Sequence, residues 1–214
     1  MENPFNQLAP RYDEWYESPE GSLIYREELD CVLLVKGRGG KRWLEVGAGT
    51  GRFGSRLGVR YALDPSPPML KRASKRGMGT IVGNAEALPL TDGCLEGVLV
   101  VVALSFCNDS SLAIRECSRV LQRKGTLVAA IVPRSSPWGQ HYCRKGAEGH
   151  PLYSRARFLD VEEVVLQAAA AGLVLKDAAS ALLRPPTETH FSGHAVRRGA
   201  IPGAGFIALR FERP

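Results

Sequence analysis

The fold is decided by Leu44-Glu45-Val46-Gly47-Ala48-Gly49-Thr50-Gly51. The preceding run from Arg42 to Val46 is short and mostly apolar, which predicts a buried strand. The three glycines then let the chain turn sharply into a helix, and they leave room for a ligand against the backbone at the carboxyl end of the strand. A dinucleotide fingerprint needs a glycine where this chain has Arg52, so the spacing favours another nucleotide-like ligand.

Strand-length apolar runs alternate with segments of helical period along the chain, which predicts a doubly wound α/β sheet. The expected strands are 42–46, 61–63, 80–82, 95–103, 126–132, 173–177 and 206–211, and the expected helices are 22–35, a short one from Arg52 to Leu57, 69–75, 111–121 and 161–171. The helix over 111–121 is expected to stop at Gly125, and Asp160 is expected to cap the last helix.

The 214 residues, 44% of them hydrophobic, are enough for one domain with a sizeable core. Lys plus Arg exceed Asp plus Glu by 28 − 22 = 6, giving a pI near 9.2, which suits a solvated basic surface more readily than a nucleic-acid site. Five cysteines without metal or disulfide spacing predict a reducing, cytoplasmic location. No secretory signal is expected, and the longest apolar stretch, Val98 to Leu104, is too short to span a membrane.

Two long connections lie between the expected strands and helices. Residues 133–158 are expected to be irregular and to form a substrate-facing insert, from which His141, Tyr142 and Tyr153 are candidate catalytic groups, although lid packing is the commoner role for such residues. Residues 184–205 contain His190 and His194 at helical spacing. No third ligand accompanies them, so we expect no metal site.

Two further loops follow neighbouring strands. Asp64 ends the second strand, where a carboxylate can accept hydrogen bonds from both hydroxyls of a ribose, although an aspartate before a proline can also form a simple turn. The segment from Gly83 to Leu90 follows the third strand. The carboxyl ends of parallel strands share one edge of a sheet, so the three loops are expected to meet at one pocket.

Four segments, taken in their order along the chain, resemble the class I methyltransferases that use S-adenosylmethionine. They are the glycine loop, Leu63-Asp64-Pro65-Ser66 with Met69-Leu70, Gly83 to Leu90, and Arg119-Val120-Leu121 through Gly125-Thr126-Leu127. The likeness covers about residues 42–132 and is closest to the small-molecule branch that includes ubiquinone and menaquinone biosynthesis enzymes. It implies a Rossmann-like, mostly parallel sheet of seven strands in the order 3-2-1-4-5-7-6, with the last strand antiparallel and helices on both faces.

The resemblance also implies a division of the single domain, 1–214. Residues 1–40 would be a cap segment, 41–132 the cofactor-binding half, 133–158 the insert and 159–214 the C-terminal part of the sheet. S-Adenosylmethionine would be the cofactor, S-adenosylhomocysteine its product, and a small molecule the methyl acceptor.

Cofactor-binding roles then follow by position. Gly47, Ala48 and Gly49 would approach the methionine part, Asp64 the ribose, and Asn84 with the Ala85 amide the adenine; Leu104 and Ser105 would border the transferring methyl group. Further positions in the same segments are Tyr12, Tyr16, Glu45, Gly51, Pro65, Ser66, Met69 and Glu86. Family members commonly have aspartate where this chain has Asn84, whose amide oxygen is a neutral acceptor.

Some of these positions have competing interpretations. Glu45 stands in an apolar strand and would organise the site near the amino acid part of the ligand, unless it is a solvated strand-end residue. Tyr12 and Tyr16 resemble an aromatic segment that closes over the cofactor in relatives, and ordinary packing is the alternative.

Two functions other than small-molecule methylation stay open. The basic second half suits an RNA methyltransferase, but the Asn/Asp-Pro-Pro-aromatic tetrad of exocyclic-amine methyltransferases is replaced by Ala103-Leu104-Ser105-Phe106. A cofactor-binding module that has lost catalysis and regulates a partner is the other alternative. The sequence leaves the oligomeric state and the acceptor atom undetermined.

Overall fold

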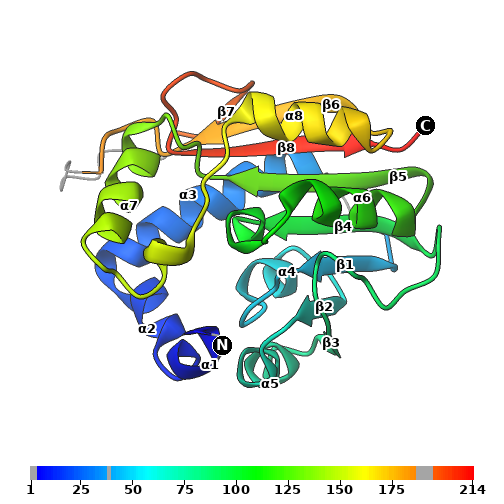
Figure 1. The fold of residues 1–214 in the computed structure, drawn as a ribbon, viewed down its shortest axis with the longest axis horizontal. Helices are drawn as coiled ribbons and strands as arrows, with labels where there is room; N and C mark the ends of the chain where they lie inside the picture. The colour runs from blue at the N-terminus through cyan, green and yellow to red at the C-terminus, as the bar shows by residue number, and fades with distance from the viewer. Residues whose placement is uncertain (1–3, 38–39, 187–194) are drawn as a thin grey trace.

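The computed structural model describes residues 4–37, 40–186 and 195–214, which form an eight-stranded mixed sheet with helices on both faces (Figure 1). The strands are β1 (Trp43–Val46), β2 (Tyr61–Asp64), β3 (Gly79–Val82), β4 (Leu95–Val101), β5 (Leu121–Ile131), β6 (Val174–Ala181), β7 (Arg197–Arg198) and β8 (Phe206–Glu212). Their order is β3-β2-β1-β4-β5-β8-β6-β7.

Strands β1 to β5 are parallel, and β8 lies antiparallel between β5 and β6. This confirms the predicted order and the antiparallel last strand, because β8 is the seventh strand of the prediction. The eighth strand, β7, pairs with Ala179 and Ser180 at the edge of the sheet. It lies in the stretch 184–205 that was expected to be a plain connection, and two residues are too few to show the alternation that marks a strand.

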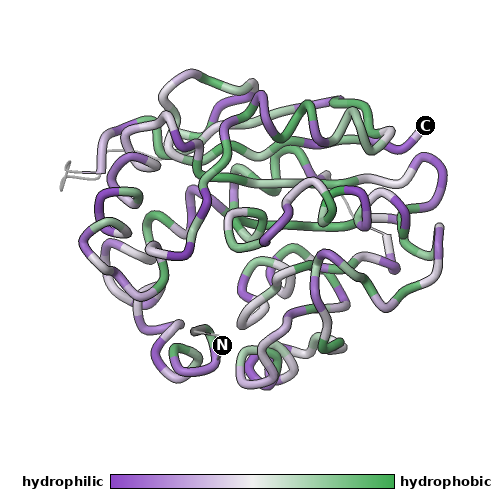
Figure 2. The backbone as a smooth tube through the Cα atoms, viewed as in Figure 1, coloured by the Kyte–Doolittle hydropathy of each residue, from purple (hydrophilic) through white to green (hydrophobic). Residues whose placement is uncertain are grey.

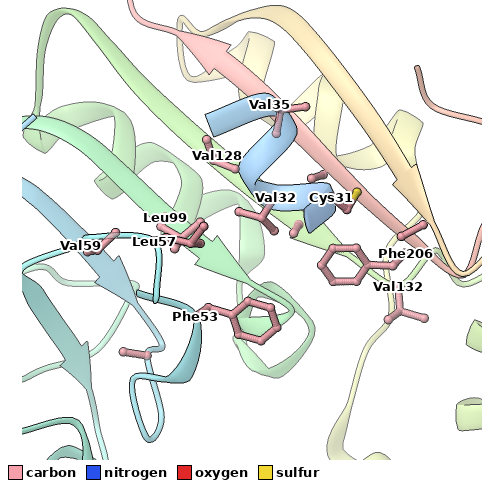
Figure 3. Packing of buried hydrophobic residues seen from close by; sticks show 14 of the residues in the cluster. Cys31, Val32, Val35, Phe53, Leu57, Val59, Leu99, Val128, Val132 and Phe206 are labelled. Carbon is pink, nitrogen blue, oxygen red and sulfur yellow. The ribbon is translucent and has the colours of Figure 1, made fainter. Parts of the chain in front are cut away.

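The helices divide between the two faces of the sheet. Figure 3 shows one face, where Val32 and Val35 of α3 (Pro19–Lys36) pack with Phe53 of α4 (Arg52–Arg56) against Val128 of β5. The helix α5 (Pro67–Lys75) joins this cluster, whereas α6 (Ser110–Val120) and α8 (Val161–Ala170) cover the other face. The central strands are accordingly the most continuously hydrophobic part of the chain (Figure 2).

The insert at 133–158 is not irregular, which corrects the prediction. It contains the helix α7 (Pro137–Ala147) and the short 3-10 helix η2 (Tyr153–Arg155). The Ser136 side chain accepts a hydrogen bond from the Gly139 amide, and Pro137 follows at the first helical position; both are common helix starts. Gly139 and Gly146 inside the segment concealed its helical character in the sequence. The N-terminal segment also forms two short helices, α1 (Pro4–Leu8) and α2 (Tyr12–Glu17).

Two predicted boundaries around the central strands were wrong. Strand β4 stops at Val101, because Val102 adopts a positive φ of 58° and the 3-10 helix η1 (Ala103–Phe106) follows. Helix α6 ends at Val120, and β5 begins at once, so Gly125 lies within β5 rather than beyond a helix end. The expected capping of α8 is present, with the Glu163 carboxylate accepting from the Asp160 amide at 2.7 Å. Among the described helices, none has the length and apolar character needed to cross a membrane.

The close packing of β4 on β1 generates a stability prediction. A Cβ atom added to Gly97 would lie 2.1 Å from the ring of Trp43, which is itself 4% exposed. We expect Gly97→Ala to lower the free energy of unfolding by about 1–3 kcal/mol, as overpacking does in cores, measured by urea denaturation. Gly83→Ala is the control, since its nearest neighbours are side chains at 3.1 Å or more. Equal losses in both variants would contradict this packing constraint.

Candidate functional site

The glycine loop between β1 and α4 has a backbone that requires its glycines. Gly47, Gly49 and Gly51 have φ values of 67°, 53° and 73°, a region that side chains strongly disfavour. A Cβ atom on Gly47 would lie 2.3 Å from that of Ala103, whereas one on Gly49 would meet no atom within 4 Å. The loop therefore packs tightly on η1 at one point and faces open space at the next, where a ligand can approach its backbone.

Asp64 joins this loop to the end of β2. Its carboxylate accepts hydrogen bonds from the amides of Gly49 and Ser66, both at 2.8 Å. Burial raises the pKa of Asp64, and the two amides act in the opposite direction. Each carboxylate oxygen has a second lone pair, so the side chain can still accept from a diol that lies against Gly49.

The turn after Asp64 divides into buried and exposed positions. Ser66 is fully buried and caps α5 by accepting from the Met69 amide at 3.4 Å, and the Met69 side chain is fully buried as well. Pro65 is exposed. The side chains of Ser66 and Met69 therefore hold the turn in place, and they do not line the open space.

The third loop of the site begins at Asn84. Its side-chain oxygen accepts from the Glu86 amide at 3.2 Å, and its side chain is exposed. Ala85 is buried, with 9% of its surface exposed. The Glu86 carboxylate accepts from the Asp109 amide at 2.5 Å and so fastens this loop to the start of α6. Asn84 thus keeps one oxygen lone pair and both amide protons for a ligand.

Glu45 is not a solvated strand-end residue. Its side chain is 2% exposed, and one carboxylate oxygen accepts from the Gly54 amide of α4 at 3.0 Å. Burial raises the pKa of Glu45 to about 8, and the nearby charge of Asp64 raises it further, against the effect of the Gly54 amide. This carboxyl group ties α4 to β1 directly beneath the glycine loop.

The segment after β4 closes the site on another side. Leu104 and Ser105 in η1 are 2% and 1% exposed, and the Ser105 hydroxyl has no hydrogen-bond partner within the described part of the chain. A cavity of about 430 Å³ opens beside Leu104, between the starts of α6 and α8. Its lining includes Cys107, Arg134 and Arg157 but no residue of the glycine loop, so it is separate from the space in front of Gly49.

The N-terminal helix α2 is fastened to the glycine loop by Asp13, which is 6% exposed. Its carboxylate accepts from the Thr50 hydroxyl at 2.9 Å and pairs with three arginines: Arg52 at 2.7 Å, Arg76 at 2.9 Å and Arg72 at 3.3 Å. Burial acts to raise the pKa of Asp13, but these partners outweigh it and the pKa is lowered. An ionised carboxylate therefore holds α2 over the loop.

Comparison with known proteins identifies the family. The chain matches a methyltransferase domain model over residues 44–129. It is 36% identical to an uncharacterised protein of Mycobacterium tuberculosis over 203 residues, which are 94% of this chain and 70% of that protein. The crystal structure of an S-adenosylmethionine-dependent methyltransferase from Thermotoga maritima, described as a possible histamine N-methyltransferase, superposes with a TM-score of 0.89 at 28% identity, covering 99% of this chain and 98% of that one. The chain belongs to the class I S-adenosylmethionine-dependent methyltransferases.

A third relative matches a shorter part of the methyltransferase. Malonyl-[acyl-carrier protein] O-methyltransferase from Methylococcus capsulatus is 39% identical over 97 residues, which are 40% of this chain and 35% of that protein. The glycine loop fits the cofactor of the family, S-adenosylmethionine, because the open space before Gly49 lies beside the free lone pairs of Asp64.

Tyrosines from three elements form two ring pairs in the methyltransferase. Tyr12 and Tyr16 of α2 have ring centroids 5.7 Å apart, and Tyr142 of α7 stacks on Tyr153 of η2 at 4.6 Å. All four rings are half-buried, and those of Tyr16, Tyr142 and Tyr153 pack against the hydrophobic core. Burial raises the pKa of Tyr16 and of Tyr153. We call these four residues the tyrosine cluster.

Phe5 of α1 joins the tyrosine cluster to the segment after β4. Its ring centroid lies 6.4 Å from that of Tyr12 and 5.2 Å from that of Phe106 in η1. Of the candidate catalytic groups, Tyr142 and Tyr153 belong to the tyrosine cluster. His141 contacts the Tyr142 ring, and its pKa is lowered by burial and by Lys145 and Arg144. His190 and His194 lie outside the described residues.

Sequence reasoning missed Asp13 as a residue that holds the site together. The partners of Asp13 lie 37 to 63 positions away, so local spacing gives no signal for them. It also missed the burial of Glu27 and Glu28 in α3, which are 2% and 9% exposed.

The Asp13 cluster generates a prediction about stability. We expect Asp13→Asn to lower the free energy of unfolding at pH 7 by about 1–3 kcal/mol, because hydrogen bonds to a charged group are lost. Since the folded pKa of Asp13 is below its usual value of 3.8, the difference from the wild type is full at pH 5–7 and disappears as the pH falls below 4. Denaturant titrations at several pH values measure this.

The matched control for Asp13 is Glu17→Gln. Glu17 also pairs with Arg52, at 2.8 Å, but its side chain is 68% exposed, so its loss should cost less than about 1 kcal/mol. A loss from Glu17→Gln equal to that from Asp13→Asn would show that the cluster is an ordinary surface ion pair.

Proposed function

We propose that this methyltransferase transfers its methyl group to a small molecule held beside the tyrosine cluster. The observation that carries the proposal is the aromatic cover: α2, α7 and η2 place half-buried aromatic rings over the same end of the sheet as the glycine loop (Figure 1). Small-molecule sites are lined mainly by hydrophobic and aromatic side chains with a few polar groups. A nucleic acid instead needs an accessible basic surface, whereas these four rings are half-buried.

Relatives also support a small acceptor. The Thermotoga maritima structure is described as a possible histamine N-methyltransferase, and the Methylococcus capsulatus relative is a malonyl-[acyl-carrier protein] O-methyltransferase. These descriptions name acceptors of different chemistry, so they favour the small-molecule class without choosing a member of it.

In the proposed complex, the cofactor lies against Gly47, Ala48 and Gly49, with the ribose on Asp64 and the adenine near Asn84 and Ala85. The methyl of a sulfonium is already activated, so the protein mainly aligns the acceptor in line with the carbon–sulfur bond and excludes water.

A transfer assay tests the acceptor class. Incubation with methyl-labelled S-adenosylmethionine and separate pools of small amines, phenols, thiols and carboxylates is expected to label at least one small-molecule pool. Total RNA serves as the competing substrate. Label in RNA alone would reject the small-molecule acceptor, and binding of S-adenosylhomocysteine without any transfer would favour a regulatory module.

The role of Asp64 is tested separately. We expect Asp64→Ala to weaken binding of S-adenosylhomocysteine by about 1.5–3 kcal/mol, the scale of hydrogen bonds to a charged group, measured by calorimetric titration below the unfolding temperature of the variant. Asp92→Ala is the control, because Asp92 is 78% exposed and lies just before the amino end of β4, away from the site. Unchanged affinity in Asp64→Ala would place the ribose elsewhere.

A further inference from the structure

The cavity of about 430 Å³ is formed by segments that follow two central strands of the sheet. Leu104 in η1 comes shortly after β4, and Arg134 comes shortly after β5. The start of α6 and residues 157–159 complete its wall. In open α/β sheets, ligands bind outside the carboxyl ends of the strands, and small-molecule sites have volumes of roughly 300–1,000 Å³. The place and the size of this cavity therefore both suit a small ligand.

Part of the cavity wall is apolar. It includes Leu104 and Phe158, which are 2% and 4% exposed, and the half-buried Leu159. The ring of Phe158 also stacks on that of Tyr142, with centroids 6.1 Å apart, so the tyrosine cluster supports this wall from behind. An apolar wall of this kind favours an organic molecule over a simple ion.

The charged side chains of the lining differ in whether they already have partners. Arg134 pairs with Glu163 at 2.9 Å, and the Asp109 carboxylate accepts from the Leu112 amide at 2.9 Å as the cap of α6. Arg157 also lines the cavity, but its side chain forms neither an ion pair nor a hydrogen bond with any residue that the structure describes. Its guanidinium group is therefore available to a ligand.

The backbone fixes Arg157 beside η1. Its amide donates to the Ser105 carbonyl at 2.7 Å. Ser105 comes directly after Leu104 and is 1% exposed, and its hydroxyl has no hydrogen-bond partner in the described part of the chain. Buried polar groups are nearly always hydrogen-bonded, so an exception needs an explanation. An orphaned hydroxyl next to a residue of the cavity wall is a second sign that this part of the molecule receives a ligand.

These groups select a negatively charged ligand. A guanidinium group presents paired N–H donors that match the two oxygens of a carboxylate. The first turns of α6 and α8 border the same cavity, and the amino end of a helix carries partial positive charge. A cationic ligand would instead meet two arginines, while the carboxylates of Asp109 and Glu163 already accept hydrogen bonds within the fold.

We propose that this cavity is a second ligand site, separate from the cofactor space, and that it binds a small organic carboxylate. Arg157 pairs with the carboxylate, and the apolar part of the ligand lies on Leu104 and Phe158. The inference goes beyond the proposed function, because it assigns a binding site whether or not the methyl acceptor is the molecule that occupies it.

The test measures binding of 3-phenylpropanoate and its neutral isostere 3-phenylpropanamide by calorimetric titration, with the protein saturated with S-adenosylhomocysteine. The wild type is expected to bind the carboxylate about 10-fold more tightly than the amide, and Arg157→Gln should lose most of this preference. Affinity for the amide should change less than about 2-fold. Added salt should weaken carboxylate binding in the wild type, because ions screen an exposed pair. Equal binding of carboxylate and amide by the wild type would overturn the proposal.

Arg155→Gln is the matched control. It removes the same charge two positions away, from an exposed residue of η2 that does not line the cavity, and it should keep the preference for the carboxylate. Arg157→Gln should melt at the wild-type temperature, because Arg157 pairs with no described residue. Equal losses of carboxylate affinity in the two variants would overturn the proposal, since they would indicate attraction to the basic surface as a whole.

A competition experiment tests whether the site is separate from the cofactor space. The cavity lining contains no residue of the glycine loop, so the affinity for 3-phenylpropanoate should agree within about 2-fold with and without S-adenosylhomocysteine. A carboxylate that S-adenosylhomocysteine displaces would be bound in the cofactor space, and this result would overturn the proposal.

The transfer assay with Arg157→Gln separates this inference from the proposed function. Labelling of carboxylate-bearing acceptors that falls in the variant, while labelling of uncharged acceptors is kept, would assign the carboxylate to the acceptor. Equal labelling by both proteins, with the binding difference present, would assign it to a second ligand. Label in RNA alone would reject the small-molecule acceptor, whereas the carboxylate site stands or falls with the binding measurements.

Discussion

The carboxylate of Asp13 is the constraint on which the site depends. Burying this carboxylate without partners would cost free energy. Thr50 and three arginines surround it, however, and its pKa is lowered despite burial. Because Arg52 and Arg76 belong to the glycine-loop side of the molecule and Asp13 to α2, the cluster joins the N-terminal helices to the cofactor-binding half. This attachment also fixes the position of Tyr12 and Tyr16, which lie on the same helix.

Three buried carboxyl groups around the site differ in how they are satisfied. Asp13 is paired with cations, and its pKa is lowered. Glu45 has one backbone amide, and its pKa rises to about 8. Glu28 has no partner among the described residues, and its pKa also rises to about 8. Desolvation opposes ionisation of all three carboxyl groups, so their partners decide whether the pKa is lowered or raised. The first two fasten elements of the fold together.

The sequence predicted what local chemistry determines. Glycines and apolar runs mark the strands, the glycine loop and Asp64 locally, and the resemblance that these segments carry implied the strand order. In the structure the Asp64 carboxylate accepts a hydrogen bond from the Gly49 amide. The segments around the tyrosine cluster were predicted less well because long-range contacts build them. Trp138 of α7 donates to the Arg184 carbonyl 46 positions away, and glycines hid α7 itself. The role of Asp13 depends on arginines that its neighbours in sequence do not reveal.

Glu27 and Glu28 show why neither spacing nor composition could reveal how α3 is buried. Adjacent residues on a helix point about 100° apart, so both can be buried only if α3 is covered on two sides. The sheet end covers one side, where Leu182 and Arg184 bind Glu27. Helix α2 packs on α3 as well. A pair of glutamates that reads as a solvated helix surface is thus buried, and only the tertiary arrangement around α3 determines which of the two gains a partner.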